Sequence, residues 1–345
     1  MKSPFLHTGT GQRGVSLIEL MVSMTIGLII MIAVISAYLG ASGASRTAEA
    51  IGRMNEDGQA ALTILTQQLR MAGVNPSQPN RHSVTLGISA RGASVPLHNS
   101  VTNAFAVRGC DVKFSNITST FSSLGCAHGA ASTGPDSISI GYEADRYNTI
   151  ALASGQPTDC MGVGIDPLSP APTYLNAAGV GVSASIYEAE NRYYIGTSAF
   201  VVNPTLYCRG NGNGSTAQPL VENIENLQFS YGTVNPNTTT SPIYVTYTPT
   251  FTTTLVLGYM SAYELENYNT APLDTSSTGL GPTGATAKRW NAVKSVRICV
   301  VARSEQPLAD SLDSARYLDC NGTLTVPPDK RLRRAYTTTV VLRNQ

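Results

Sequence analysis

The sequence predicts an α+β protein in which a long N-terminal helix packs on a loop-rich, mainly antiparallel β domain. Three observations predict this fold class. No charged residue occurs from Leu20 to Ser45, and apolar residues then continue at helical spacing to about Met71. Beyond Pro76 the composition changes to Ser, Thr, Asn, Gly and Pro with short apolar alternations, which is typical of strands joined by loops.

Length, charge and composition restrict the class of protein. A chain of 345 residues is long enough for one large domain or two ordinary ones. The formal net charge of +1 gives no field that would attract nucleic acid at long range. The 31 glycines and the low charged fraction of 13% favour a loop-rich β domain over a helical cytosolic enzyme.

The apolar run predicts a single membrane span at about residues 20–39. At about 1.5 Å per residue, a helix of this length matches a hydrocarbon core of about 30 Å. The preceding flank carries Lys2 and Arg13 and no acid before Glu19, which places the N-terminus in the cytoplasm. The β domain is then expected in the periplasm, outside the bacterial inner membrane.

Helical periodicity does not stop at the end of the apolar run. Over residues 46–71 one apolar stripe recurs at spacings of three and four, and most charged residues lie elsewhere. The stripe consists of Ala48, Ile51, Met54, Gly58, Ala61, Leu62, Leu65 and Leu69. We therefore expect one helix over 15–73, spanning the membrane first and packing on a domain afterwards.

Glu19 is a lone acid at the entrance of the apolar run, and three interpretations of this segment compete. It is an ordinary signal peptide cleaved near Ala41–Ser45, a plain signal anchor, or a segment cut after Gly14 that leaves the apolar helix in the mature protein. An acid at this place has a free-energy cost, and a signal peptide has no use for it. Together with the continuing periodicity, this favours the third interpretation.

The stretch "RGVSLIELMVSMTIGLIIM" resembles the type IV prepilin signal, which combines a basic leader ending in glycine, a hydrophobic first mature residue and glutamate at the fifth mature position. The resemblance implies a leader at residues 1–14, cleavage between Gly14 and Val15 by a prepilin peptidase, and N-methylation of Val15. Val15 departs from the phenylalanine that is commoner at this place.

Cleavage would give Glu19 a partner. The new amine at Val15 has an ordinary pKa near 8 and is cationic at neutral pH. In a growing filament, the Glu19 carboxylate of one subunit can pair with the amine of its neighbour, which fixes register more than it adds stability. The alternative is that Glu19 lies at the membrane interface and extends its carboxylate to the lipid headgroups, without a role in assembly. Gly27, Gly40 and Gly43 either allow close helix approach or are neutral.

The β domain, expected over residues 74–345, contains several segments with a recognisable pattern. Residues 136–145 and 290–305 alternate apolar and polar side chains and predict strands, and 333–344 predicts a final strand. Residues 218–232 predict a short helical turn with Leu220, Ile224 and Leu227 inward, followed by a strand at Phe229 and Tyr231. Residues 233–254 and 270–288 are expected to be long loops.

These segments extend the family resemblance. "LYCRGNG" (206–212), "PLVENIENLQFSYG", "WNAVKSVRICVVARS" and "RRAYTTTVVLRN" together are similar to PilW-type minor pilins, which are relatives of the J pseudopilins of type II secretion. The resemblance implies a pilin-like fold, with a spindle helix packed on an enlarged β domain. Residues 78–135 resemble no family, and their fold is left open.

The six cysteines are expected to form disulfides, because an even count behind a membrane segment suits an oxidising compartment. They are Cys110, Cys126, Cys160, Cys208, Cys299 and Cys320. Pairing of sequence neighbours is one of the connectivities that six cysteines allow. A zinc site is poorly supported, since no C-x-x-C pair occurs, although His128 follows Cys126 by two residues.

No catalytic constellation is found, and no cofactor or metal is predicted. "GNGNGS" (210–215) is interpreted as a flexible loop, because it lacks the lysine and the context of a phosphate loop. Asp136, Glu143 and Asp145 lack calcium-loop spacing and are interpreted as solvated acids. The basic run Lys330, Arg331, Arg333 and Arg334 is interpreted as a solvated face.

The sequence therefore predicts a non-enzymatic minor pilin that helps to initiate type IV pilus assembly, with a place at the pilus tip. The expected partners are a prepilin peptidase, other minor pilins, the major pilin and the inner-membrane assembly platform. Two alternatives stay open, a type II secretion pseudopilin of the J type and a membrane-anchored adhesin. An anchored periplasmic enzyme would need a catalytic cluster that the sequence does not offer.

Overall fold

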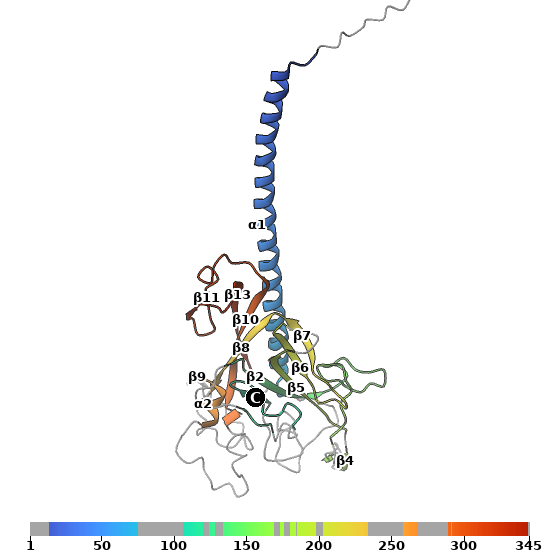
Figure 1. The fold of residues 1–345 in the computed structure, drawn as a ribbon. Coiled ribbons are helices and arrows are strands. Elements are labelled where there is room, and N and C mark those ends of the chain that lie inside the picture. The colour runs from blue at the N-terminus through green and yellow to red at the C-terminus, as the bar shows by residue number, and fades with distance from the viewer. Residues whose placement is uncertain are drawn as a thin grey trace, which may run out of the picture. The chain divides into compact units, whose positions relative to one another are not determined.

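The computed structural model describes residues 14–74, 106–119, 124–127, 134–168, 173–175, 180–183, 185–197, 203–233, 258–267, 289–290 and 292–343. The chain divides into two compact units, Met1–Ile51 and Gly52–Gln345. The first unit holds the N-terminal part of helix α1, and the second holds the rest of α1 and the β-sheets (Figure 1).

Helix α1 runs without interruption from Leu17 to Met71. No proline interrupts the hydrogen-bond ladder over this length. The helix ends beside Gly73, whose φ of 70° lies in the left-handed region that glycine adopts without a Cβ penalty. The Val74 N–H then donates to the Met71 carbonyl at 2.8 Å and closes the last turn.

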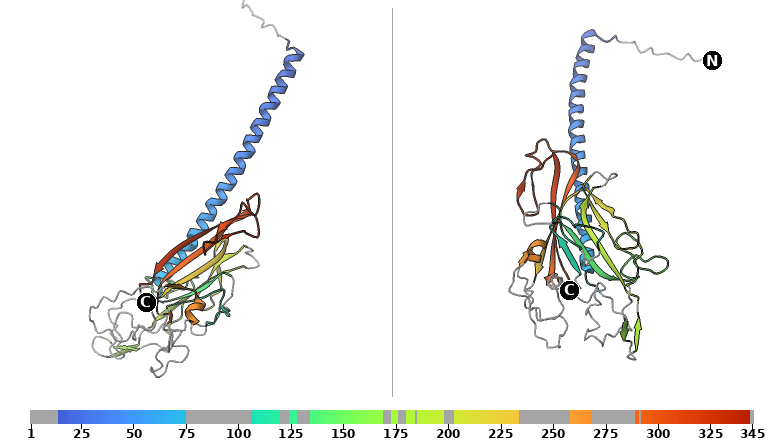
Figure 2. Two further views of the ribbon diagram at one scale, coloured as in Figure 1. Left: turned by 90° about the vertical axis from the view of Figure 1, so that its left-hand side faces the viewer. Right: turned by 60° about the horizontal axis from the view of Figure 1, so that its bottom comes forward.

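Two antiparallel sheets form most of the second unit. The five-stranded sheet has the order β1 (Val107–Cys110), β2 (Ser137–Ala144), β5 (Tyr187–Gly196), β6 (Thr205–Arg209) and β7 (Gln218–Glu222). The four-stranded sheet has the order β13 (Arg331–Val341), β10 (Val293–Pro307), β8 (Ile224–Thr233) and β9 (Gly258–Met260). Figure 2 shows the sheets on either side of the C-terminal part of α1.

Smaller elements complete the second unit. Two short pairs are formed by β3 (Thr173–Leu175) with β4 (Gly181–Ser183), and by β11 (Tyr317–Leu318) with β12 (Leu324–Thr325). The short helix α2 spans Ala262–Asn267. Its N-terminus is capped by Asp111, whose carboxylate accepts hydrogen bonds from the Ala262 and Tyr263 N–H groups at 2.7 and 2.9 Å.

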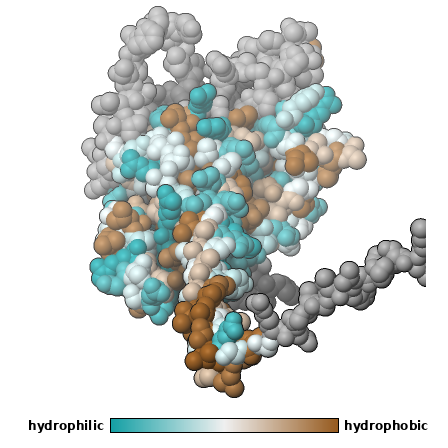
Figure 3. Space-filling model, turned by 90° about the horizontal axis from the view of Figure 1, so that it is seen from above, coloured by the Kyte–Doolittle hydropathy of each residue, from teal (hydrophilic) through white to brown (hydrophobic). Residues whose placement is uncertain are grey.

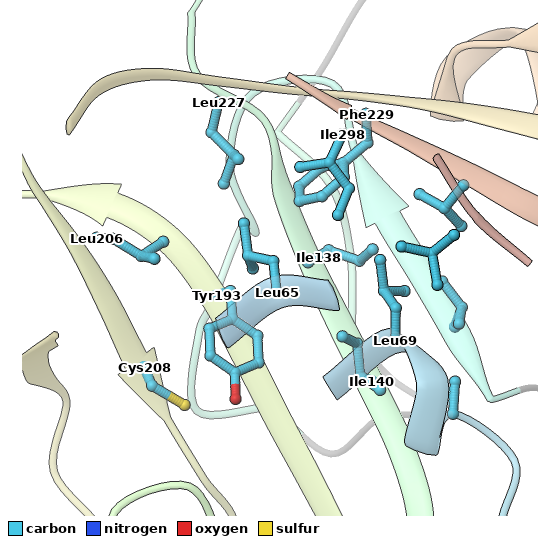
Figure 4. Close-up of a cluster of buried hydrophobic side chains, with 14 of the residues drawn as sticks. Leu65, Leu69, Ile138, Ile140, Tyr193, Leu206, Cys208, Leu227, Phe229 and Ile298 are labelled. Carbon is cyan, nitrogen blue, oxygen red and sulfur yellow. The ribbon is translucent and has the colours of Figure 1, made fainter. Parts of the chain in front are cut away.

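The core lies where α1 enters the space between the sheets. Its buried stripe consists of Met54, Gly58, Ala61, Leu65 and Leu69. Figure 4 shows Leu65 and Leu69 among side chains of both sheets, namely Ile138, Ile140, Tyr193, Leu206, Leu227, Phe229 and Ile298. Fully burying one such leucine contributes about 1.5–3 kcal/mol, so this stripe holds the two sheets on one helix.

Polar contacts fix the rotation of this part of α1 against the sheets. Gln68 accepts a hydrogen bond from the side chain of buried Asn191 at 3.1 Å, and Asn191 also donates to the Tyr142 hydroxyl at 3.2 Å. On the other sheet, the Tyr336 hydroxyl donates to Asn55 at 2.6 Å. Gln68 and Asn55 reach their partners only while each points to its own sheet, so a rotation of α1 about its axis would break these hydrogen bonds.

The structure confirms the predicted fold class, a long helix on a mainly antiparallel β domain. Strands β2, β10 and β13 lie where alternation predicts them. The expected helical turn near Leu220 is wrong, because β7 and β8 are both strands and are separated only by Asn223. The loops expected at 234–254 and 270–288 lie outside the described residues, as does most of 78–135.

Candidate functional site

The segment preceding α1 is exposed and non-helical. Gly14, Val15 and Ser16 come before the first helical residue, and Val15 is 68% exposed. No atom lies within 4 Å of the position that a Cβ on Gly14 would occupy. The Gly14–Val15 peptide bond is therefore open to a protease, which needs an accessible and extended chain.

Ser16 starts the helix. Its carbonyl accepts the Glu19 and Leu20 N–H groups at 3.0 and 3.2 Å, so Ser16 is the N-cap residue. Ser16 and Glu19 also have the spacing of a capping box, in which a glutamate stands three residues after a serine. This signal lies in the four residues "SLIE" and is an additional indication of where the helix begins.

Glu19 lies in the first turn of α1, one turn after Val15, and is exposed. Within the part of the chain that the structure describes, its carboxylate has no hydrogen-bond or ion-pair partner. The positive end of the helix dipole favours an anion at this place. The geometry thus offers a free carboxylate beside the residue whose amine a cut after Gly14 would release.

The helix around this carboxylate is apolar on every side. From Leu17 to Leu39 the large apolar side chains are exposed, from 48% at Leu20 to 78% at Leu17. Among the described helices, α1 is the one long and apolar enough to cross a membrane by length and composition. Figure 3 shows this segment as a continuous hydrophobic surface, whereas the surface of the β domain is mixed.

Polar atoms within the apolar segment are satisfied locally. The hydroxyls of Ser23, Thr25 and Ser36 donate to carbonyls one turn back, at 3.0, 2.8 and 2.9 Å. A Cβ added at Gly27 or Gly40 would meet no atom within 4 Å. The segment therefore carries little desolvation penalty and leaves space for close approach of another helix.

Three disulfides link the six cysteines in the order of sequence neighbours. The pairs are Cys110–Cys126, Cys160–Cys208 and Cys299–Cys320. They attach a loop to β1, a loop to β6 and the β11–β12 hairpin to β10. Disulfides of this kind persist in an oxidising compartment. His128, the residue considered with Cys126 for zinc, lies outside the described residues.

The glycine-rich segment 210–215 is held by Asp159 rather than left flexible. The Asp159 carboxylate accepts hydrogen bonds from the backbone N–H groups of Met161, Val163 and Gly212 at 2.8, 3.1 and 2.9 Å. A Cβ on Gly210 would lie 2.1 Å from an Asp159 oxygen. Glycine is required there because a buried carboxylate fills the space of a side chain.

The acids considered for calcium have structural partners, and the prediction that they are solvated is wrong for two of them. Asp136 and Glu143 are each 4% exposed. Asp136 accepts the Phe229 N–H at 2.7 Å and so links the two sheets, while Asp145 caps a turn by accepting the Tyr147 N–H. Burial raises the pKa of Asp136 to about 8. Among the described residues no three metal-ligating side chains gather.

The prediction of a solvated basic face is also wrong for Arg333. Its side chain is 1% exposed and contacts Glu225 at 2.8 Å and Asp329 at 2.7 Å. Burial acts to raise the pKa of Asp329, but hydrogen bonds from Arg333 and Arg331 outweigh burial and lower this pKa to about 2. These ion pairs join the start of β13 to Glu225 of β8 and to Asp329.

Strand β5 carries buried charges that the sequence analysis missed. Burial raises the pKa of both Glu188 and Glu190, and Arg192 lies 3.0 Å from Glu190. The alternation of β5 puts the three side chains on one face, away from the core residue Tyr193. The charged residues in "YEAENRYY" predict a strand with one face exposed to solvent. The burial of this polar face follows from tertiary packing, which the sequence pattern does not reveal.

Two family models match the chain. Residues 9–35 match the prokaryotic N-terminal methylation motif, and residues 192–344 match type IV pilus-assembly protein W. The first covers Gly14, Val15, Glu19 and much of the apolar helix, and the second covers the four-stranded sheet and strands β6 and β7. No curated protein and no solved structure matches the chain.

Proposed function

Because the chain is a type IV pilus minor pilin of the PilW family, we propose that it is processed at Gly14–Val15 and helps to initiate pilus assembly. In this proposal residues 1–14 are the leader, 15–73 the helix and 74–345 a periplasmic domain. The subunit waits in the inner membrane as a single-pass protein and then joins other minor pilins in a complex at the pilus tip.

Processing is supported by the local structure on both sides of the cut. Gly14 leaves the protease room, and Ser16 keeps the helix from including the scissile bond. Methylation of the Val15 amine leaves it cationic, so the charge needed for pairing persists. The proposed partners in this step are the prepilin peptidase and the membrane itself.

Assembly is supported by the free carboxylate of Glu19. In the apolar axis of a bundle, an unpaired carboxylate would be strongly unfavourable, while a pair with a neighbour's Val15 amine removes that penalty. Each subunit offers one amine and one carboxylate, so pairing propagates from subunit to subunit. We propose that the major pilin and the inner-membrane assembly platform are recruited after this first contact.

The observation that carries the proposal is that helix α1 connects the two segments of the chain that match family models. The methylation motif covers the start of α1, and the PilW match lies in the sheets that enclose its C-terminal part. A PilW match favours a pilus subunit over a type II secretion pseudopilin. A free-standing adhesin would not need the Glu19 carboxylate.

Mass spectrometry of the mature N-terminus tests the processing step. The proposal expects a chain that begins with methylated Val15. A chain that begins near Ala44 would instead identify an ordinary secreted protein, and a chain that retains residues 1–14 would identify a signal anchor. A Gly14→Ala variant is the matched control for the cut, because a prepilin peptidase should fail on it while the helix stays unchanged.

A further inference from the structure

The chain contains three Asn-Gly pairs, Asn211–Gly212, Asn213–Gly214 and Asn321–Gly322. An asparagine that precedes glycine can lose its side-chain ammonia without an enzyme. The reaction begins when the backbone nitrogen of the glycine attacks the asparagine Cγ, and a residue without a Cβ leaves this approach open. The structure describes all three pairs, and each is held in a different way.

The Asn211–Gly212 pair is fixed at both groups that would react. The Asn211 side chain accepts the Glu190 N–H at 2.9 Å and donates to the Glu188 carbonyl at 2.8 Å. The Gly212 N–H donates to the buried Asp159 carboxylate at 2.9 Å, and a Cβ at Gly212 would lie 2.8 Å from the same oxygen. Attack would require the amide and the nitrogen to leave their partners together, so the fold protects this pair.

The Asn321–Gly322 pair is exposed, but its backbone is held. The Gly322 N–H donates to the Asp319 carbonyl at 3.1 Å, and the Asp319 carboxylate accepts the Asn321 N–H at 2.9 Å. The neighbouring Cys320 is bonded to Cys299 and anchors this turn to β10. The glycine nitrogen must therefore break a hydrogen bond before it can attack.

The Asn213–Gly214 pair has neither restraint. Both residues are exposed, and among the described residues no hydrogen bond engages the Asn213 side chain or the Gly214 N–H. No atom lies within 4 Å of the Cβ position at Gly214. The Ser215 N–H donates to the Gly212 carbonyl at 2.9 Å, so the pair supplies the two central residues of a β-turn. The φ of 77° at Gly214 is that of a type II turn.

This turn can bring the nitrogen to the amide without disturbing the rest of the loop. A flip of the Asn213–Gly214 peptide converts a type II turn into a type I turn and requires Gly214 only to exchange a positive φ for a negative one. The flip rotates the Gly214 nitrogen about the Asn213 Cα–C bond, which is the rotation that attack on Cγ requires. The Asn213 N–H, which donates to the Gly164 carbonyl at 3.2 Å, belongs to the preceding peptide and keeps its partner.

We propose that Asn213 is a site of spontaneous deamidation, and that the fold makes it the preferred one of the three Asn-Gly pairs. Hydroxide removes the Gly214 N–H proton, the nitrogen forms a bond to the Asn213 Cγ, and the Cγ–Nδ2 bond breaks. The side-chain nitrogen takes a proton from water and leaves as ammonia. Water then adds to either carbonyl of the cyclic imide and opens the ring to aspartate or isoaspartate. Water is the only co-reactant, so the extent of reaction increases with the age of the chain.

The modification changes the loop at its exposed tip. Both products add a carboxylate at position 213. Isoaspartate also lengthens the backbone by one carbon between Gly212 and Ser215, whose hydrogen bond closes the turn. The turn should therefore loosen, while Gly212 stays held by Asp159. This inference does not depend on the proposed function.

Peptide mapping by mass spectrometry tests the site. The full chain, in detergent micelles and with its disulfides intact, is incubated at mildly alkaline pH, and each pair is followed by the mass increase that converts an amide into an acid. We expect Asn213 to react at least about fivefold faster than Asn321, where a hydrogen bond must break first, and Asn211 to react most slowly. A smaller advantage of Asn213, or an Asn213 that does not react, overturns the proposal.

The unfolded chain separates the effect of the fold from that of the sequence. In guanidinium chloride, with the disulfides reduced, each asparagine keeps its glycine but loses its hydrogen-bond partners, so the three rates should converge. If Asn213 keeps its full advantage there, the neighbouring residues set the preference and the structural claim fails. Asn213→Asp supplies the standard for the aspartate product. Asn213→Gln is the matched control, which should remove the signal at this position and leave the other two unchanged.

Discussion

Gly58 allows α1 to pack directly against the ring of Tyr336 in β13. A Cβ at this position would lie 2.4 Å from the Tyr336 ring, whose hydroxyl is held by Asn55. Because the ring is anchored at its far end, it cannot move away without losing that hydrogen bond. The sequence predicted Gly58 in the apolar stripe, but not the need for glycine, since Tyr336 comes from the last strand.

We expect Gly58→Ala to destabilise the β domain by about 1–3 kcal/mol through overpacking. Gly52→Ala is the matched control in the same helix, because no atom lies within 4 Å of its Cβ position. That control should be neutral or stabilising by about 0.5–1 kcal/mol. Urea unfolding measures both, and equal effects would contradict the role given to the Tyr336 ring.

Asp136 makes the stability of the domain depend on pH. Burial raises its pKa to about 8 in the folded state, and the charge of Asp111 raises it further in the same direction. The folded state thus keeps a proton that the unfolded chain releases above about pH 4. This contribution to stability is full below about pH 4 and is lost as the pH rises to about 8.

Asp136→Asn should therefore flatten the pH dependence, because an amide oxygen can still accept the Phe229 N–H and carries no charge. Melting temperatures measured from about pH 5 to about pH 8 should fall less in this variant than in the wild-type chain. Asp310→Asn, at an exposed position, serves as the control. Parallel curves for Asp136→Asn and the wild type would show that Asp136 is not the group responsible.

At the scale of elements, the strand pair β7–β8 shows why a clear pattern was misinterpreted. Ile224 and Leu227 are both buried and three residues apart, as in a helix. The spacing arises because Ala302 pairs with Ile224 and Val301 with Asn226, which leaves Glu225 as a bulge. A bulge shifts the period of two by one residue, and its position depends on the partner strand.

Asn223 separates the same two strands. Its φ of 60° lies in the left-handed region, which asparagine tolerates better than most residues, and it sends β7 and β8 into different sheets. By contrast, α1 was predictable from its apolar run and from the helical spacing of the stripe that follows, and β10 from the alternation of Val296, Ile298, Val300 and Ala302, all of which are buried. The six cysteines indicated disulfides, but only the fold selects the pairing.

The disulfide between Cys299 and Cys320 should stabilise the domain by limiting the unfolded chain. Replacing both cysteines by alanine is expected to lower the free energy of unfolding by about 3 kcal/mol under the chain-entropy model. The hairpin should also become more susceptible to proteolysis near Leu318. Urea unfolding and limited proteolysis measure the two effects, and an unchanged unfolding curve would contradict this account.

At the scale of the whole molecule, the organisation follows from a single change of surface along α1. Residues up to Leu39 are apolar on every side, and from Met54 onward one stripe is buried while the opposite face is polar. This change can be predicted from the sequence. The distribution of the strands between two sheets cannot be predicted in the same way, because it depends on long-range contacts such as the hydrogen bond between Asp136 and Phe229. The free state of Glu19 within the described residues is consistent with a partner on another chain.

Counting copies of the subunit in purified pili tests the central claim most directly. Quantitative mass spectrometry compares the wild-type chain with Glu19→Ala and with Glu56→Ala, an acid replaced on the exposed face of the same helix. The account predicts that Glu19→Ala is cleaved after Gly14 like the wild type yet falls in the pili by about tenfold or more, because a buried charge is left unpaired. Equal copy numbers for all three chains would contradict it.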